Sequence, residues 1–369
     1  DIERWHCLSS VGAPTKIPEI VSPETSIDRR APSSCDPAMD LPESRDRTIH
    51  AIREMLYNRY GAWHDAPIVA EVQWRCGRSS PAGDLPWRRS MLCFNVPDCD
   101  TPEAWRAAIA AASEAGLAVA GHVPRRVELA EALAAQASVE HLAAFGDAID
   151  AQAPGARWSW TNLYLAQPAT PETLAAAAAL VAAGRAAVTP TLLERDRSIG
   201  TERDLAEWRA DPRLALLPQE AVGAWIGALS GRAAQLDDAD LELLAKGRAN
   251  RLALVRALHD AGARLLIGTD TPNPFVIPGT SVAEEISLYV EAGVPPLDAL
   301  RYATKGAAEF LGDKESGEIA AGKRADFILV ASDPLADISV IETPAGVVLR
   351  GEYLSREELG RLSRDLAAP

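Results

Sequence analysis

The chain has 369 residues, of which 47% are hydrophobic, and a formal net charge of −15. This length and apolar content are sufficient for one large domain with a full core and a second, smaller one. The negative charge and the lack of a run rich in Lys and Arg exclude a nucleic-acid-binding footprint and a polybasic membrane patch, so we expect small molecules or further copies of the chain as partners.

Membrane insertion and targeting are not indicated by the sequence. No apolar run approaches the roughly 20 residues needed to cross a bilayer. The first residues lack both the basic region and the apolar region of a signal peptide. We therefore expect a soluble chain with no targeting segment in it, and the sequence assigns no compartment.

The first hundred residues differ in composition from the rest. All five cysteines and all three methionines precede residue 100. An odd number of cysteines without C-x-x-C spacing predicts free thiols rather than a zinc ribbon or a closed disulfide framework. Residues 1–60 show no sustained period and are expected to be loop, apart from a short helix at Asp46–Tyr60. Short strands are predicted at Pro67–Trp74 and Met91–Val96.

From residue 101 onward, Ala/Leu-rich helices alternate with short apolar strands, which predicts β/α units and a parallel sheet. Thr101 is the expected N-cap of the first helix, with Pro102 at its first position. The predicted helices are Thr101–Gly116, Arg126–Ala137, Pro171–Gly184, Ala239–Gly262, Val282–Gly293 and Pro296–Gly312. The strands between them are Leu117–Val123, Ser138–Leu142, Ala186–Leu192 and Ala263–Asp270.

The tail of the chain changes character again. Ala325–Ala331 and Ala345–Leu354 are predicted as two strands separated by a Pro-Leu turn region. They indicate an added sheet rather than another β/α unit.

Histidine and aspartate bind metals in many enzymes, and three such residues stand at the carboxyl ends of predicted strands: His122, His141 and Asp270. In a parallel β/α barrel these ends converge on one face, so residues far apart in sequence can surround one centre. Imidazole and carboxylate are suitable ligands for zinc, and the carboxylate can also take a proton from water. A single histidine at a strand end is more often structural, but three such residues together favour a metal site.

The order of motifs GHVP, SVEHL, VTPTL, IGTD, PG-x-S-x-x-EE, EAG-x-x-P-x-x-ALR-x-AT and SGEIAAGKRADFILVASDPL resembles the amidohydrolase superfamily, specifically its imidazolonepropionase-like and Xaa-Pro dipeptidase-like branch. The last motif, Ser316–Leu335, is the most specific, and the resemblance covers about residues 88–360. It implies a TIM-type (β/α) barrel whose front half is degenerate or incomplete, with a small C-terminal β-sandwich remnant. The implied domains are an atypical N-terminal region (1–87), strands four to eight of a metal-dependent hydrolase barrel (88–315) and C-terminal strands of the accessory sandwich (316–369).

The resemblance also implies the chemistry of the site. His122 on strand five and His141 on strand six are then metal ligands, and Asp270 on strand eight is both a ligand and the general acid/base. The expected cofactor is a divalent metal, with zinc preferred, and the expected reaction is hydrolysis of an amide C–N bond in a small-molecule or dipeptide-like substrate. Thr189 and Thr191 lie two apart on one strand face and are candidates for lining the substrate pocket, although the favoured interpretation is that they are ordinary β-branched strand residues.

The sequence departs from the family pattern before residue 100. The pattern has a His-x-His pair on strand one, whereas His6, His50 and His64 are isolated. The bridging lysine expected on strand four falls on Asn95, which cannot be carboxylated. Either the upstream region has diverged into a non-catalytic form, or an upstream change of reading frame has replaced the native family sequence.

Three functional hypotheses follow. The leading one is a metal-dependent amidohydrolase, and the alternative is a catalytically impaired or non-catalytic relative that acts as a binding or oligomerisation module. Deaminase or isomerase chemistry at a mononuclear site is the third. Gly317–Lys323 spells G-x-x-x-x-G-K but is predicted to be a turn, because Arg324 follows where a P-loop needs Ser or Thr. His259, near the end of its helix, is predicted to be structural.

Overall fold

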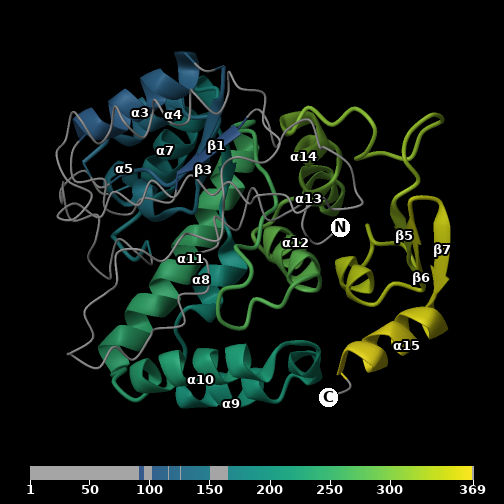
Figure 1. Ribbon diagram of the computed structural model, residues 1–369. Coiled ribbons are helices and arrows are strands. Elements are labelled where there is room, and N and C mark those ends of the chain that lie inside the picture. Colours follow the sequence, from purple (N-terminus) through teal and green to yellow (C-terminus); the bar gives the residue numbers. More distant parts are fainter. Residues whose placement is uncertain (1–90, 95–101, 115, 125, 150–164, 368–369) are drawn as a thin grey trace, which may run out of the picture.

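The computed structural model describes residues 91–94, 102–114, 116–124, 126–149 and 165–367 (Figure 1). The predicted helix at Asp46–Tyr60, the predicted strand at Pro67–Trp74 and the Asn95 position lie outside the described residues, as does the whole predicted N-terminal region.

A parallel sheet forms the framework of the molecule, in the order β1-β2-β3-β4. Beside the last strand, β4, a further segment pairs through Leu265, which forms a parallel bridge to Val188. Leu266 N–H donates to the Val188 carbonyl over 3.0 Å, so the predicted strand Ala263–Asp270 joins the sheet through a single bridge. All these segments run in the same direction, which puts their carboxyl ends on one edge. The four strands are β1 (Met91–Phe94), β2 (Ala118–Gly121), β3 (Ser138–Glu140) and β4 (Ala187–Thr189).

The helices that alternate with these strands confirm the predicted β/α units. Helix α7 begins as its sequence predicts, because the Thr170 hydroxyl accepts from the backbone N–H of Thr173 and Pro171 occupies the first turn. The predicted helix at Pro296–Gly312 is divided in two at Thr304, where ψ is −90°. The helices are α3 (Pro102–Glu114), α4 (Leu129–Ala135), α7 (Pro171–Ala183), α11 (Asp238–Asp260), α12 (Ser281–Glu291), α13 (Pro296–Ala303) and α14 (Lys305–Phe310).

A helical insertion between β4 and α11 was not predicted. Its helices α9 and α10 lie together at the bottom of Figure 1, below α8 and α11. They bury their own small apolar cluster, which includes Leu205 and Leu229 and is joined by Phe275 and Ile277 from the loop after Asp270. The insertion therefore packs on the segment that follows a candidate ligand. The elements are α8 (Leu192–Arg197), α9 (Glu202–Arg209), η4 (Pro212–Leu216) and α10 (Gln219–Ala233); η3 (Ala143–Phe145) and α5 (Gly146–Ile149) follow β3.

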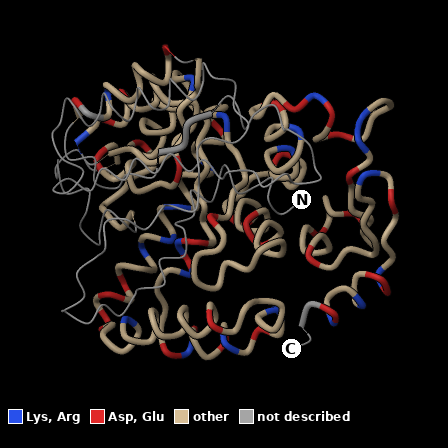
Figure 2. The backbone as a smooth tube through the Cα atoms, in the orientation of Figure 1, with Lys and Arg blue, Asp and Glu red and all other residues tan. Residues whose placement is uncertain are grey.

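The main core lies between the parallel sheet and the helices that cover it. It joins buried side chains such as Trp105 of α3, Val188 of β4 and Leu254 of α11. The buried hydroxyl of Tyr289 donates to the Leu266 carbonyl over 2.8 Å and so satisfies a polar group within this core. Figure 2 shows acidic and basic residues interspersed along the described chain. None of the helices in this part of the chain is long and apolar enough to cross a membrane.

The tail forms a separate antiparallel sheet in the order β5-β6-β7. The prediction of a single strand at Ala345–Leu354 is wrong, because Arg350 and Gly351 adopt positive φ angles of 54° and 84° and turn the chain back on itself. Gly317–Lys323 lies in turns and loop, which confirms that it is not a phosphate-binding loop followed by a helix. The elements are β5 (Phe327–Leu329), η5 (Ile338–Glu342), β6 (Gly346–Leu349), β7 (Glu352–Ser355) and an unpredicted C-terminal helix α15 (Arg356–Ala367).

Candidate metal centre

The residues predicted as ligands lie on one edge of the parallel sheet. His122 follows β2, and His141 follows β3, where its N–H donates to the Thr189 carbonyl over 2.8 Å. Nε2 of His141 lies 3.6 Å from Oδ2 of Asp270. The rings of His122 and His141 are tilted against each other with 4.6 Å between their centroids. The structure therefore brings His141 together with both of the other predicted ligands.

A glutamate that the sequence did not single out joins this centre. Glu194 lies in the first turn of α8, directly after β4, and is buried. Donor atoms of His141, Glu194 and Asp270 all lie within 4.8 Å of one another, the one such set in the part of the chain that the structure describes. His122 is not in this set and contacts it through the His141 ring. A sequence signal did exist, because Glu194 is the first acidic residue after the end of a predicted strand.

The backbone at the centre adopts an uncommon conformation. His141, Thr191 and Asp270 have φ angles of 64°, 50° and 55°, in the left-handed region that side chains with a Cβ rarely adopt. Backbone strain of this kind tends to cluster at functional sites. It turns the chain after β3, after β4 and after the segment that contains the Leu265 bridge, so the three residues can approach one another.

The two threonines predicted to line the substrate pocket are buried, with relative exposures of 0% for Thr189 and 1% for Thr191. Oγ1 of Thr191 lies 2.5 Å from Nδ1 of His141. This contact shows that Thr191 is placed to orient a predicted ligand, and its role in substrate binding stays a prediction.

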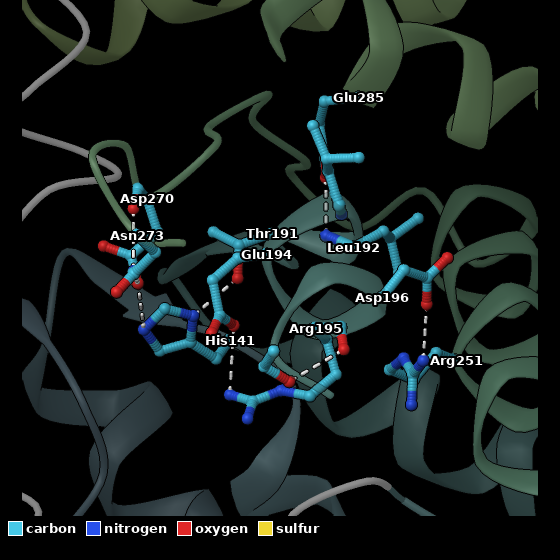
Figure 3. Close-up of polar contacts among 12 residues, drawn as sticks. His141, Thr191, Leu192, Glu194, Arg195, Asp196, Arg251, Asp270, Asn273 and Glu285 are labelled. Atoms are coloured by element: carbon cyan, nitrogen blue, oxygen red, sulfur yellow. Dashed lines mark hydrogen bonds and ion pairs between the residues drawn. The ribbon is translucent and has the colours of Figure 1, made fainter. Parts of the chain in front are cut away.

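Further contacts hold the acidic groups in place (Figure 3). The Asn273 amide donates to Oδ2 of Asp270 and to its carbonyl, over 2.8 Å in each case. The Arg195 guanidinium forms an ion pair with Glu194 over 3.2 Å. The Glu285 carboxylate accepts from the backbone N–H groups of Leu192 and Leu193, both over 2.8 Å. The start of α8 is thus fixed by a side chain of α12.

Burial sets the protonation of these groups. It lowers the pKa of His122 to about 4, with a further decrease from the Arg195 charge. Burial, and then the neighbouring His122, lowers the pKa of His141 well below its ordinary value. Burial, followed by the negative charge of Glu194, raises the pKa of Asp270 well above its usual range. Neutral imidazoles offer lone pairs, and carboxylates that repel each other are stabilised by a cation.

The donor set fits a divalent cation. One imidazole and two carboxylates within a few ångströms are ligands that zinc accepts, and manganese and iron also bind such mixed nitrogen and oxygen donors. His259, near the end of α11, contacts the Tyr302 hydroxyl over 2.9 Å, and its structural role stays a prediction.

Comparison with known proteins identifies the family. The model of the amidohydrolase family matches residues 98–354. The solved structure of bottromycin amidohydrolase is 30% identical, with a TM-score of 0.54, over 72% of this chain and 57% of that chain. Imidazolonepropionase of Deinococcus deserti is 39% identical over 85 residues, which are 23% of this chain and 21% of that protein. Ochratoxinase of Aspergillus niger is 36% identical over 90 residues, 24% of this chain and 18% of that protein.

The similarity to these curated relatives thus spans about a fifth of their length. The family match extends over more than half of the chain. Together with the likeness to bottromycin amidohydrolase, it confirms the TIM-barrel-like α/β fold. The chain belongs to the amidohydrolase family.

Proposed function

We propose that this chain is a metal-dependent hydrolase that cleaves an amide C–N bond in a small-molecule or dipeptide-like substrate. His122, His141 and Asp270 are its proposed metal ligands, and Asp270 is also its general acid/base. The observation that best supports this is the approach of His141, which follows β3, to within 3.6 Å of Asp270, which follows the bridge at Leu265. The name of the similar bottromycin amidohydrolase supports an amide substrate.

Each residue has a defined part in this proposal. A divalent cation, with zinc preferred, polarises the scissile carbonyl and lowers the pKa of water when it is bound. His122 and His141 remain neutral because burial lowers their pKa values. The Asp270 carboxylate takes a proton from the attacking water and delivers it to the leaving nitrogen. Asn273 orients that carboxylate through its amide.

The proposed domain organisation keeps the boundaries given by the resemblance. Residues 88–315 supply strands four to eight of the barrel, which agrees with the four parallel strands and the bridge at Leu265. The front half of the barrel is degenerate or incomplete, and residues 316–369 are the remnant of an accessory β-sandwich. The separate sheet β5-β6-β7 supports this last assignment.

The alternative is a relative that binds without catalysing. It is favoured by one specific observation, the absence of a His-x-His pair from the whole sequence. Without that pair, two ligands of the family pattern are missing. In this case the centre would serve binding or assembly of copies of the chain.

The experiment is metal analysis combined with a hydrolysis screen. The purified chain is stripped of metal, reconstituted with zinc and assayed against dipeptides and cyclic amides. We expect about one bound zinc and turnover that the Asp270→Asn variant loses, whereas Asp365→Asn, an exposed control on α15, retains both. Zinc binding without turnover would favour the alternative. A chain that binds no zinc and turns over no substrate would contradict the proposed hydrolase and would also favour the non-catalytic alternative.

A further inference from the structure

We infer that Glu194 is a ligand of the metal, supplied from the helix after strand β4. The inference rests on the proposed metal-dependent function and adds a residue that the family resemblance did not provide. Glu194 would add a fourth metal-binding side chain to the three that the sequence predicts, which are His122, His141 and Asp270.

The positions of the donor atoms support this assignment. Donors of His141, Glu194 and Asp270 come from three separate segments of the chain and lie within 4.8 Å of one another. Ligand atoms that are each about 2 Å from one zinc ion lie at most about 4 Å apart. Small side-chain rotations would therefore place these donors around one ion.

The electrostatic surroundings of Glu194 favour the binding of a cation beside it. Its Oε2 atom is buried and accepts no hydrogen bond from the residues that the structure describes, although the Arg195 guanidinium forms an ion pair with it over 3.2 Å. The Arg195 charge also acts on Asp270, which lies close to the Glu194 carboxylate. Two carboxylates at such a short distance repel each other when they are removed from water. A divalent cation between them offsets both this repulsion and the loss of hydration.

The fold holds Glu194 toward the centre rather than away from it. Glu285 fixes the backbone at the start of α8 through two hydrogen bonds from Leu192 and Leu193 (Figure 3). On the same short helix, Asp196 forms an ion pair with Arg251 of α11 over 2.6 Å. Because α8 is tied to both α12 and α11, Glu194 has little freedom to leave the site.

The resulting donor set leaves room for chemistry. One imidazole and two carboxylates would supply three ligands to a divalent cation, fewer than the four of a closed structural zinc site, and His122 would be the nearest further donor. The ion pair between Arg195 and Glu194 resembles the outer contacts that usually orient a ligating carboxylate.

Cobalt binding tests the inference without an assay of activity. Metal-free protein is titrated with Co²⁺ while its visible absorption and the bound metal are measured. We expect Glu194→Gln to weaken binding by at least about 100-fold, more than the loss of most outer partners causes, and to change the visible bands. Glu202→Gln, an exposed control on α9, should match the unmodified chain. Glu194→Asp keeps the charge but withdraws it by one methylene, so it should bind with intermediate affinity.

The outcomes separate the two proposals. If Glu194→Gln and Glu194→Asp bind Co²⁺ as the unmodified chain does while His141→Ala loses it, Glu194 is not a ligand and the proposed function stands. If the unmodified chain itself binds no Co²⁺, the proposed function and the inference both fail. Glu194→Asp also keeps the test decisive if the Gln variant does not fold.

Discussion

The hydroxyl of Thr191 and the ring of His141 lie in contact, with 2.5 Å between Oγ1 and Nδ1, although the two residues are 50 apart in sequence. This contact engages one ring nitrogen and leaves Nε2, which faces Asp270 over 3.6 Å, as the nitrogen available to a cation. Partners of this kind orient metal-binding histidines in many proteins. The relationship gives Thr191 a defined task in the proposed centre.

Replacing the hydroxyl of Thr191 should therefore weaken metal binding. We expect Thr191→Val, which keeps the shape of the side chain, to lower Co²⁺ affinity by about 10-fold to 100-fold because the His141 ring is no longer held. Thr191→Ser retains the hydroxyl and should remain close to the unmodified chain. Titration of all three proteins with Co²⁺ measures the effect. Equal losses in the Val and Ser variants would show that packing, and not the hydrogen bond, is responsible.

Asn273 should control the pH at which metal binds. Its amide donates to Oδ2 of Asp270, and a hydrogen bond to the charged form lowers the pKa of a carboxyl group. Asn273→Ala removes this effect and raises the pKa of Asp270 further, so half-maximal Co²⁺ binding should move to higher pH. Binding isotherms collected across a pH series measure the shift. Identical pH profiles for the variant and the unmodified chain would contradict the prediction.

The sequence predicted the fold where helices and strands alternate against one core. Helices such as α7 were predicted correctly because the sequence marks their first residues with a cap and because their apolar residues pack in the main core. Helices α9 and α10 were missed because they pack on each other and on Phe275, outside that alternation. The turn at Arg350 and Gly351 was missed because the apolar residues on both sides of it resemble one continuous strand.

The site was predicted only in the part that strand ends define. His141 follows β3, and Asp270 follows the segment that bridges to β4 at Leu265, so their approach comes from the parallel sheet. Glu194 belongs to a short helix whose place depends on Thr191 in a left-handed conformation and on the distant Glu285. The only local signal for Glu194 is its position shortly after a predicted strand, and neither of these two features can be recognised from the local sequence.

Glu284 should hold the helical insertion against the rest of the molecule. Its carboxylate pairs with Arg213 of η4 over 2.7 Å and with Arg197 of α8 over 3.2 Å. We expect Glu284→Ala to increase hydrogen exchange in residues 201–233, while exchange in the parallel strands stays unchanged, because local opening reflects the loss of local contacts. Hydrogen exchange followed by mass spectrometry measures this.

The control for this variant is Glu202→Ala, an exposed change on the insertion itself. It should leave the exchange pattern of residues 201–233 as it is in the unmodified chain. Faster exchange across the whole molecule in Glu284→Ala would instead indicate global destabilisation and contradict a local anchoring role.

Glu285 should make stability depend on pH in a predictable direction. Burial raises its pKa from 4.5 to about 8 in the folded chain, against the effect of two backbone hydrogen bonds. Between these values the folded state binds more protons than the unfolded state, so this group's contribution to stability is complete below about pH 4.5 and is lost as the pH rises to about 8.

The Glu285→Gln variant cannot titrate at this position and should lack the effect. The difference in unfolding free energy between the unmodified chain and the variant should therefore fall with increasing pH, by at most about 1.4 kcal/mol per pH unit for one proton. Denaturant unfolding at pH 5, 6, 7 and 8 measures it, with Glu202→Gln as the exposed control. Glu140, whose pKa burial raises to about 7, titrates in both proteins and cancels in the difference. A difference that stays constant over this range would show that Glu285 remains charged throughout, held by Leu192 and Leu193.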